Sequence, residues 1–233
     1  MSSNASPGKL FLVATPIGNL EELSPRAIKT IESSDLVACE DTRISRRILD
    51  KYSISKPLIS YREENEKSQS EILAEKLSQG LNIALLSDAG LPTISDPGFR
   101  LVRECHLQDL KVIPIPGPNA AMSALCASGL PTHQFIFLGF LPSKKAAAGN
   151  MLKKWIDFTG SVVLYESKYK MIRTLNLFED LLEPERYICI ARELTKIHEN
   201  IISGPLPEVI KKFHSGSAKG EFTLIIAPKG YSF

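Results

Sequence analysis

The 233-residue sequence has few of the features that mark secreted, membrane or metal-binding proteins. Its four cysteines include no CxxC pair, and all sit in or beside apolar runs, so we expect buried free thiols in a reducing compartment. The most apolar run between loops, 135–141, is too short to span a bilayer. The first nine residues lack the apolar core of a signal peptide. These absences predict a cytoplasmic protein with no membrane association.

Strong net charge is also missing. The formal net charge is +2 and charged residues make up 23% of the chain, so composition favours neither disorder nor binding of nucleic acid through overall charge. Any contact with RNA must then come from local clusters. The length is sufficient for two domains, each with its own core.

Several common catalytic and nucleotide-binding motifs do not occur. The sequence contains no G-x-x-x-x-G-K-[ST] phosphate loop, no G-x-G-x-x-G after an expected strand and no G-x-S-x-G nucleophile motif. Its histidines, cysteines and acids show no metal-ligand spacing, so we predict no metal site.

What is present is an alternation of short apolar runs with amphipathic stretches. This pattern is typical of buried strands followed by helices. In the first half, the expected strands cover 9–15, 35–40, 56–60, 82–87 and 111–117. In the second half, the expected strands 187–194 and 198–204 have almost nothing between them, which favours antiparallel pairing. We predict an α/β protein of two domains, with a mostly parallel N-terminal sheet and a mixed C-terminal sheet.

The Gly- and Pro-containing segment 128–134 is expected to connect the two domains. The predicted boundaries are a disordered lead over 1–8, an N-terminal domain over 9–128 and a C-terminal domain over 129–233.

Four polar or Gly/Pro-rich loops follow expected strands of the first half. In open α/β sheets, ligands bind beyond the carboxyl ends of the strands, so these loops are expected to converge on one site. They cover 15–23, 39–43, 87–98 and 114–121. The third loop, SDAGLPTISDPG, contains Asp88 and Asp96 but no lysine or arginine. Its acids favour a ligand with hydroxyls or positive charge, such as a nucleoside carrying an amino acid and a sulfonium. The alternative is that both acids only cap turns or the next helix.

Two charged regions lie in the second half. The segment RELTKIHE (192–199) is either part of a site or an exposed stretch held by salt bridges. Lysines and an arginine in 143–155 and 167–173, with Trp155, Tyr165 and Tyr169 nearby, form either an RNA-binding surface or solvated helix faces.

Seven segments, taken together and in order, closely resemble the ribosomal RNA small-subunit methyltransferase I family. They read VATPIGNLEELSPRA, EDTR, SDAGLPTISDPG, PIPGPNAA, ASGLP, FLGFLP and RELTKIHE. That family belongs to the tetrapyrrole methylase-like, class III S-adenosylmethionine methyltransferases. The resemblance implies a cofactor cleft between two α/β domains and a homodimer. It also implies 2′-O-methylation of a cytidine in the decoding region of small-subunit (16S-type) rRNA, either free or in the 30S subunit.

The resemblance also implies functional residues. Those expected to bind the cofactor are Pro16, Gly18, Asp88, Ala89, Gly90, Ile94, Ala121, Met122, Tyr165, Ala191 and Thr223. A ribose hydroxyl is a poor nucleophile, so a base that removes its proton would speed transfer. The catalytic candidates are Glu40, Asp41, Arg43, Glu66, Arg192, Glu193, Lys196 and Glu199, in which the carboxylates are possible bases and the cations possible phosphate contacts.

Some residues depart from the family pattern. Leu91 and Thr93 exchange the polar and apolar places of the usual SDAGTPLISDPG, and Glu64 stands where the family has a histidine. We expect residues 96–98 mainly to start the next helix, and no extra RNA-contacting tail at the C-terminus. Two other functions stay open: a precorrin-type tetrapyrrole methyltransferase of the same fold, and a non-catalytic RNA-binding or ribosome-assembly protein.

Overall fold

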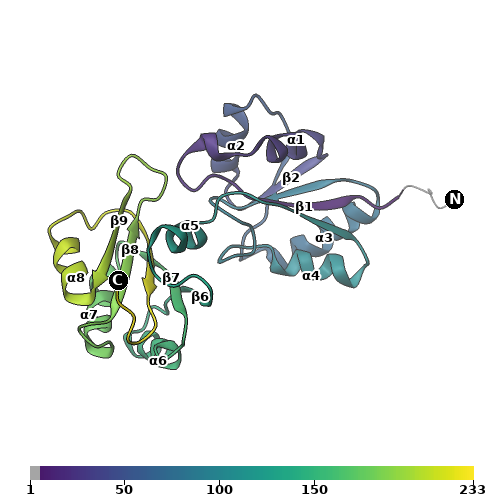
Figure 1. Ribbon diagram of the computed structural model, residues 1–233. Helices are drawn as coiled ribbons and strands as arrows, with labels where there is room; N and C mark the ends of the chain where they lie inside the picture. The colour runs from purple at the N-terminus through teal and green to yellow at the C-terminus, as the bar shows by residue number, and fades with distance from the viewer. Residues whose placement is uncertain (1–5) are drawn as a thin grey trace. The chain divides into compact units, whose positions relative to one another are not determined.

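The computed structural model describes residues 6–233, which divide into two compact units at 119/120 (Figure 1). The division lies before helix α5 (Ala120–Ala127), nine residues before the expected boundary at 128/129. The reason is packing, because α5 contacts the strands β7 (Ser161–Ser167) and β10 (Glu221–Ile226) of the second unit.

Unit 1 contains a five-stranded sheet whose neighbouring strands are all parallel. Its strands are β1 (Lys9–Val13), β2 (Leu36–Cys39), β3 (Leu58–Ser60), β4 (Ile83–Leu86) and β5 (Lys111–Ile115), in the spatial order β3-β2-β4-β1-β5. Its helices are η1 (Leu20–Glu22), α1 (Pro25–Ser33), α2 (Thr42–Lys51), α3 (Glu66–Ser78) and α4 (Phe99–Leu107). The predicted strands and the parallel sheet are confirmed.

Helices cover both faces of this sheet, as Figure 1 shows, with α1 and α2 on one side and α3 and α4 on the other. The cause is the alternation of side chains along each strand. Val37 packs in the core with α1 and α2, whereas Ala38 packs in the core with α3 and α4. Strands buried on both faces must be apolar throughout, which explains the uninterrupted runs in the sequence.

Unit 2 contains a mixed sheet, as predicted. Its remaining strands are β6 (Phe135–Phe140), β8 (Tyr187–Arg192) and β9 (Asn200–Pro205), and its order is β6-β7-β10-β8-β9. Only the β6–β7 pair is parallel among the pairs of this sheet in the described residues. Helices α6 (Lys145–Trp155), α7 (Met171–Leu181) and α8 (Leu206–His214) pack on one face and enclose the core, and α5 contacts the sheet from the other.

Two expectations need correction. The predicted lead extends too far, because the N–H of Gly8 donates to the carbonyl of Leu77 at 2.8 Å and Gly8 is buried. The first five residues of that lead lie outside the described residues. Cys126 is exposed, whereas the other three cysteines are buried, because α5 turns Ala124 and Leu125 inward instead.

No helix in the described part of the chain is long and apolar enough to cross a bilayer.

Candidate active site

The loops that follow β1 and β4 are joined by hydrogen bonds. The N–H of Thr15 donates to the carbonyl of Gly90 at 2.9 Å, and the N–H of Gly90 donates back at 3.1 Å. The buried Thr15 hydroxyl donates to the carbonyl of Ser87 at 3.0 Å. The Ser87 hydroxyl in turn donates to the carbonyl of Gly90 at 2.9 Å. These bonds fix the start of the 87–98 loop against the end of β1.

The loop after β5 meets the same region through two glycines. A Cβ atom on Gly117 would lie 2.8 Å from the Cβ of Ala14, closer than real Cβ atoms approach. Gly90 has a φ of +83°, and a Cβ placed there would lie 3.7 Å from the carbonyl oxygen of Pro118. Glycine permits both the close approach and the left-handed backbone. The loops that follow β1, β4 and β5 therefore lie close together just beyond the ends of these strands.

The loop after β2 joins this group through Asp88. The N–H of Asp41 donates to Oδ1 of Asp88 at 3.0 Å. The predicted convergence of four strand ends is thereby confirmed within unit 1. The joined loops contain the residues expected there to bind a cofactor: Pro16, Gly18, Asp88, Ala89, Gly90 and Ile94.

Three carboxylates with raised pKa values interact within these loops. Burial raises the pKa of Glu40, and the negative charges of Asp88 and Glu64 raise it further. Burial also raises the pKa of Asp88, although the N–H of Asp41 opposes this. Burial and the charges of Glu40 and Asp88 raise the pKa of Asp96 to about 7. Asp96 therefore interacts electrostatically with Glu40 and Asp88. The sequence predicts only that it helps to start α4.

The rest of the 87–98 loop follows an unusual backbone path. Thr93 and Ser95 have φ values of +74° and +64°, a left-handed conformation that costs a non-glycine residue on the order of 1 kcal/mol. Gly98 has a φ of +138° and forms the N-cap of α4. A Cβ on Gly98 would lie 2.7 Å from Cγ2 of Thr93. Thr93, one of the exchanged residues, therefore packs against the start of α4.

Asp41 and Arg43 form a pair at the start of α2. Asp41 is the N-cap, and its Oδ1 accepts a hydrogen bond from the N–H of Arg43 at 2.8 Å. Its Oδ2 lies 2.6 Å from Nη2 of the Arg43 guanidinium. Side-chain and backbone hydrogen bonds from Arg43 hold the pKa of Asp41 well below its usual range. Asp41 is therefore a poor proton acceptor, and Arg43, 86% exposed, keeps its charge at the surface.

Glu66 caps a helix other than its own. Its Oε1 accepts from the N–H groups of Gly98 at 3.0 Å and Arg100 at 3.2 Å, and from the hydroxyl of Tyr61 at 3.2 Å. Gly98 has no side chain with which to cap α4, and a carboxylate is favourable at the positive N-terminal end of a helix. This buried carboxylate has a structural role that the sequence did not suggest.

The predicted cofactor residues of unit 2 gather on one face of its sheet. Thr223 of β10 lies opposite Tyr165 of β7 and opposite Ala191 of β8. Directly opposed residues of antiparallel strands point to the same face, so the three form one row. The N–H of Ala121, in the first turn of α5, donates to the Tyr165 hydroxyl at 3.2 Å. Met122 follows in the same turn.

The charged segment between β8 and β9 is tied to β10. The Lys196 ammonium lies 3.1 Å from Glu193 and 2.8 Å from Glu221. Burial alone raises the pKa of Glu193, but the N–H of Glu221 and the charge of Lys196 outweigh it and lower the pKa. Glu199 accepts from the N–H of Thr195 at 2.6 Å. These contacts favour the salt-bridged interpretation of the segment over a base at Glu193.

The basic residues near α6 and α7 have mixed surroundings. Lys145 pairs with Asp180 at 3.3 Å. The Lys168 ammonium lies 4.9 Å from the centre of the Tyr169 ring, and Tyr169 is 86% exposed. Tyr165, which was expected nearby, instead binds α5. The RNA-binding surface stays a prediction.

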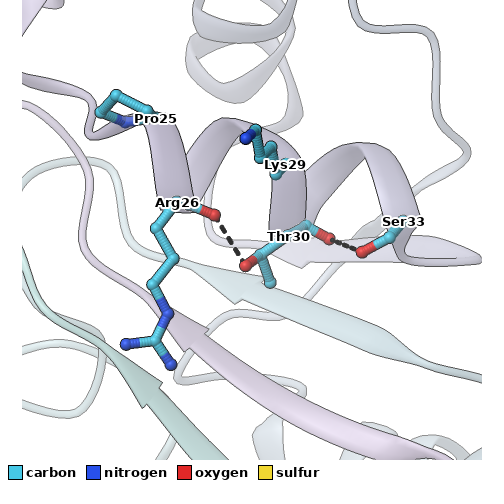
Figure 2. A pocket seen from close by; sticks show the side chains of 5 residues that line it. All are labelled: Pro25, Arg26, Lys29, Thr30 and Ser33. Carbon is cyan, nitrogen blue, oxygen red and sulfur yellow. Dashed lines mark hydrogen bonds between the residues drawn. The ribbon is translucent and has the colours of Figure 1, made fainter.

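A separate pocket of about 400 Å³ runs along α1 and is lined by none of the predicted site residues (Figure 2). Its hydroxyls bind within the helix, because Thr30 donates to the carbonyl of Arg26 and Ser33 donates to that of Thr30. Within the described residues, no group of three or more histidines, cysteines and acids is placed to hold a metal ion.

Comparison with known proteins assigns the chain to a family. The family model for tetrapyrrole (corrin/porphyrin) methylases matches residues 9–210. Ribosomal RNA small subunit methyltransferase I of Haemophilus influenzae is 44% identical over 95% of this chain and 79% of its own length. The enzyme of the same name from Thermotoga maritima is 42% identical over 95% of this chain and 99% of its own. The chain belongs to the ribosomal RNA small subunit methyltransferase I family, within the tetrapyrrole methylases.

Solved structures of other tetrapyrrole methylase-like proteins share its fold. The methyltransferase CobJ superposes with a TM-score of 0.71 at 15% identity, covering 97% of this chain and 96% of its own. Diphthine synthase gives a TM-score of 0.72 at 15% identity over 94% of this chain and 90% of its own. Uroporphyrin-III C-methyl transferase from Thermus thermophilus, described as complexed with S-adenyl homocysteine, gives 0.63 at 16% identity over 94% of this chain and 97% of its own. The predicted α/β fold of the tetrapyrrole methylase type is confirmed.

Proposed function

We propose that this chain transfers a methyl group from S-adenosylmethionine to the 2′-hydroxyl of a cytidine in the decoding region of small-subunit rRNA. The proposal rests on the acidic side chains of the unit 1 loops, taken together with the family of the chain. The converging loops of unit 1 hold Glu40, Asp88 and Asp96 as interacting carboxylates in a chain 44% identical to a small-subunit rRNA methyltransferase.

The residues present fit the cofactor chemically. Burial and the charges of Glu40 and Asp88 disfavour the anionic form of Asp96, so a cation or a hydroxyl donor near it would be favoured. S-adenosylmethionine supplies an activated methyl group on a positively charged sulfur. In unit 1 the joined loops would hold the cofactor. Gly90 has no side chain, so its backbone could approach the cofactor closely. In unit 2 the predicted cofactor residues Tyr165, Thr223 and Ala191 form one row.

Glu40 is the proposed general base. Asp41 is bound by Arg43, Glu66 caps α4, and Glu193 is paired with Lys196, so each of these carboxylates is already engaged. Glu40 has no ion pair within 4 Å among the described residues, and its pKa is raised. A raised pKa makes a carboxylate a better proton acceptor when it is ionised, which suits removal of the hydroxyl proton. Holding the attacking hydroxyl in reactive alignment with the methyl group would contribute the larger effect, roughly 7–11 kcal/mol.

Exposed side chains of unit 1 support two further parts of the proposal, RNA binding and formation of a homodimer. The guanidinium of Arg43 is oriented by Asp41 and would bind a phosphate of the RNA. Phe99 and Leu107 of α4 are 67% and 69% exposed, which supports a second copy of the chain covering this face in a homodimer. The substrate is rRNA, as free RNA or within the 30S subunit.

The experiment is methyl transfer from labelled S-adenosylmethionine to 30S subunits, free small-subunit rRNA or precorrin intermediates. We expect label in rRNA, and mass mapping of nuclease fragments should place it on the ribose of one decoding-region cytidine. Label in a tetrapyrrole would overturn the RNA assignment. Calorimetry with S-adenosylhomocysteine provides the second arm. Absence of binding, together with absence of transfer, would assign the chain to a non-catalytic RNA-binding role.

A further inference from the structure

A second concave region lies in unit 2, away from the row of predicted cofactor residues. It is a pocket of about 500 Å³ between the loop that joins β8 to β9 and the end of α8. Ile190, which lines it, precedes Ala191 of the row, and successive strand residues point to opposite faces. Ile190 packs in the core with α8. The pocket therefore opens on the α8 face of the sheet, and the row lies on the α5 face.

The floor of the pocket is apolar and includes aromatic rings. Ile202 lies opposite Ile190 in the β8–β9 pair, and both line the floor. The rings of Phe213 and Phe222, 5.8 Å apart between centroids, close its inner side. Ile197 stands at the rim with 98% of its surface exposed. A pocket of this volume with an apolar base is typical of sites for small organic ligands.

The rim is positively charged. Arg192 donates to the carbonyls of Lys219 at 2.6 Å and His198 at 3.4 Å, so its position is fixed by neutral groups. Within the described residues, neither Arg192 nor Lys212 forms an ion pair within 4 Å. Glu199 also lines the pocket, and it accepts from the N–H of Thr195 at 2.6 Å. Two cations, of which Arg192 is held in place, against one carboxylate, with His198 beside them, favour an anionic ligand.

Neutral polar groups complete the lining. Asn200, the first residue of β9, offers an amide that both donates and accepts hydrogen bonds. Ser217 adds a hydroxyl that already accepts from the N–H of Lys219 at 3.2 Å. An anion attached to a flat, partly apolar ring with hydrogen-bonding edges matches this combination of groups.

We propose that this pocket binds one nucleotide unit, with its phosphate at Arg192 and Lys212 and its base between Ile197 and Asn200. The ligand is a nucleotide of the RNA substrate other than the nucleotide that is methylated. This assignment of the ligand to the RNA rests on the proposed function. A free nucleotide has the same chemistry, and the experiments below separate the two sources.

The first experiment is an amide-NMR titration of the full chain with cytidine 5′-monophosphate, cytidine and inorganic phosphate. We expect the monophosphate to shift the signals of Asn200, Lys212 and Ser217, and to do so at lower concentration than cytidine or phosphate alone. The Lys212→Ala variant should weaken this response, and the Lys211→Ala variant should not. Lys211 is the matched control because it is exposed on the same turn of α8 but does not line the pocket. Equal responses in both variants, or shifts confined to other residues, would overturn the proposal.

The second experiment measures binding of small-subunit rRNA as a function of salt. Loss of one phosphate contact should reduce the slope of log affinity against log salt by about 1 in Lys212→Ala, with a smaller change in Lys211→Ala. Suppose that Lys212→Ala and Lys211→Ala give equal slopes while cytidine 5′-monophosphate shifts the signals of the pocket. The ligand would then be a free nucleotide and not a nucleotide of the RNA. The proposed function is tested separately: a wild-type chain that transfers no methyl group to rRNA, yet shows the nucleotide shifts, contradicts that function and leaves the pocket assignment intact.

Discussion

The carboxylate of Asp88 accepts a hydrogen bond from the backbone N–H of Asp41 at 3.0 Å, which ties the loop after β4 to the loop after β2. Forty-seven residues of sequence separate the two partners. The same bond leaves the side chain of Asp41 free to hold Arg43, while Asp88 stays within electrostatic reach of Glu40. One short contact thus organises both the cationic and the acidic parts of the unit 1 loops.

Replacing Glu40 by glutamine should slow methyl transfer. Loss of a general base typically lowers kcat by about 10²–10⁴-fold, and the isosteric change should leave KM for rRNA nearly unchanged. Wild-type kcat should rise with pH through the raised pKa of Glu40, because the base acts in its ionised form. Glu40→Gln should lose this limb of the profile. Glu63→Gln, at an exposed position in the segment before α3, is the matched control. Wild-type kcat in Glu40→Gln would rule out Glu40 as the base.

Replacing Asp96 by asparagine should stabilise the protein above neutral pH. The pKa of Asp96 is raised from 3.8 to about 7 in the folded state. Between these values the folded state binds more protons than the unfolded state, so the free energy of unfolding falls as pH rises through this window. At pH 8, Asp96→Asn should gain on the order of 1–3 kcal/mol over wild type, and the gain should vanish below pH 4.

Urea unfolding at several pH values measures this difference. Asp50→Asn, which removes the same charge at an exposed position of α2, is the control and should follow the wild-type pH dependence. Parallel curves for Asp96→Asn and wild type would show that Asp96 ionises normally in the folded chain.

Binding of the cationic cofactor should release a proton near pH 7. A positive charge beside Asp96 lowers its pKa, so a carboxyl that is partly protonated in the free protein ionises when the cofactor binds. Calorimetric titration in buffers of different ionisation enthalpy gives the number of protons released. We expect release from wild type and little from Asp96→Asn. An identical proton count in both proteins would place the cationic group elsewhere.

The sequence predicts the fold well because the determining patterns are local. Strands such as β4, buried on both faces, must be apolar at every position, and that requirement is visible without knowing any partner. The convergence of the four loops was equally predictable, since it follows from parallel strands alone.

What the sequence does not reveal is which polar groups pair across the fold. The sequence predicts that Asp96 mainly starts α4, but its pKa is raised by burial and by the charge of Glu40, which is 56 residues away in the chain. Glu66 was a candidate base, yet it binds the N–H of Gly98, which is 32 residues away. Both roles arise from tertiary contacts that no local pattern records. The contact of Thr93 with Gly98 likewise needs the left-handed backbone of the loop.

Replacing Glu66 by glutamine should destabilise unit 1 more than it impairs chemistry. The change removes the charge that faces the N-terminus of α4 and weakens its hydrogen bonds to the N–H groups of Gly98 and Arg100. Loss of such a cap costs about 1–2 kcal/mol. We expect a lower urea midpoint and, at temperatures where the variant is folded, a kcat far closer to wild type than that of Glu40→Gln.

The control for Glu66 is Glu71→Gln, an exposed change on the same helix that should leave the midpoint unchanged. A loss of kcat as large as that of Glu40→Gln, with an unchanged midpoint, would instead make Glu66 part of the chemistry.

Replacing Tyr165 by phenylalanine isolates the hydroxyl that holds α5. The ring should keep its contacts with Phe137 and Phe140, at 4.9 and 5.5 Å between centroids, while the N–H of Ala121 loses its acceptor. Because Ala121 is predicted to bind the cofactor, a looser first turn of α5 should weaken S-adenosylhomocysteine by about 1 kcal/mol, or roughly fivefold in Kd. Calorimetry measures this change. Tyr187→Phe, which removes a hydroxyl from the first residue of β8, four residues before Ala191, should bind like wild type. Unchanged Kd in Tyr165→Phe would separate the Ala121 contact from cofactor binding and leave it a purely structural bond between α5 and the sheet.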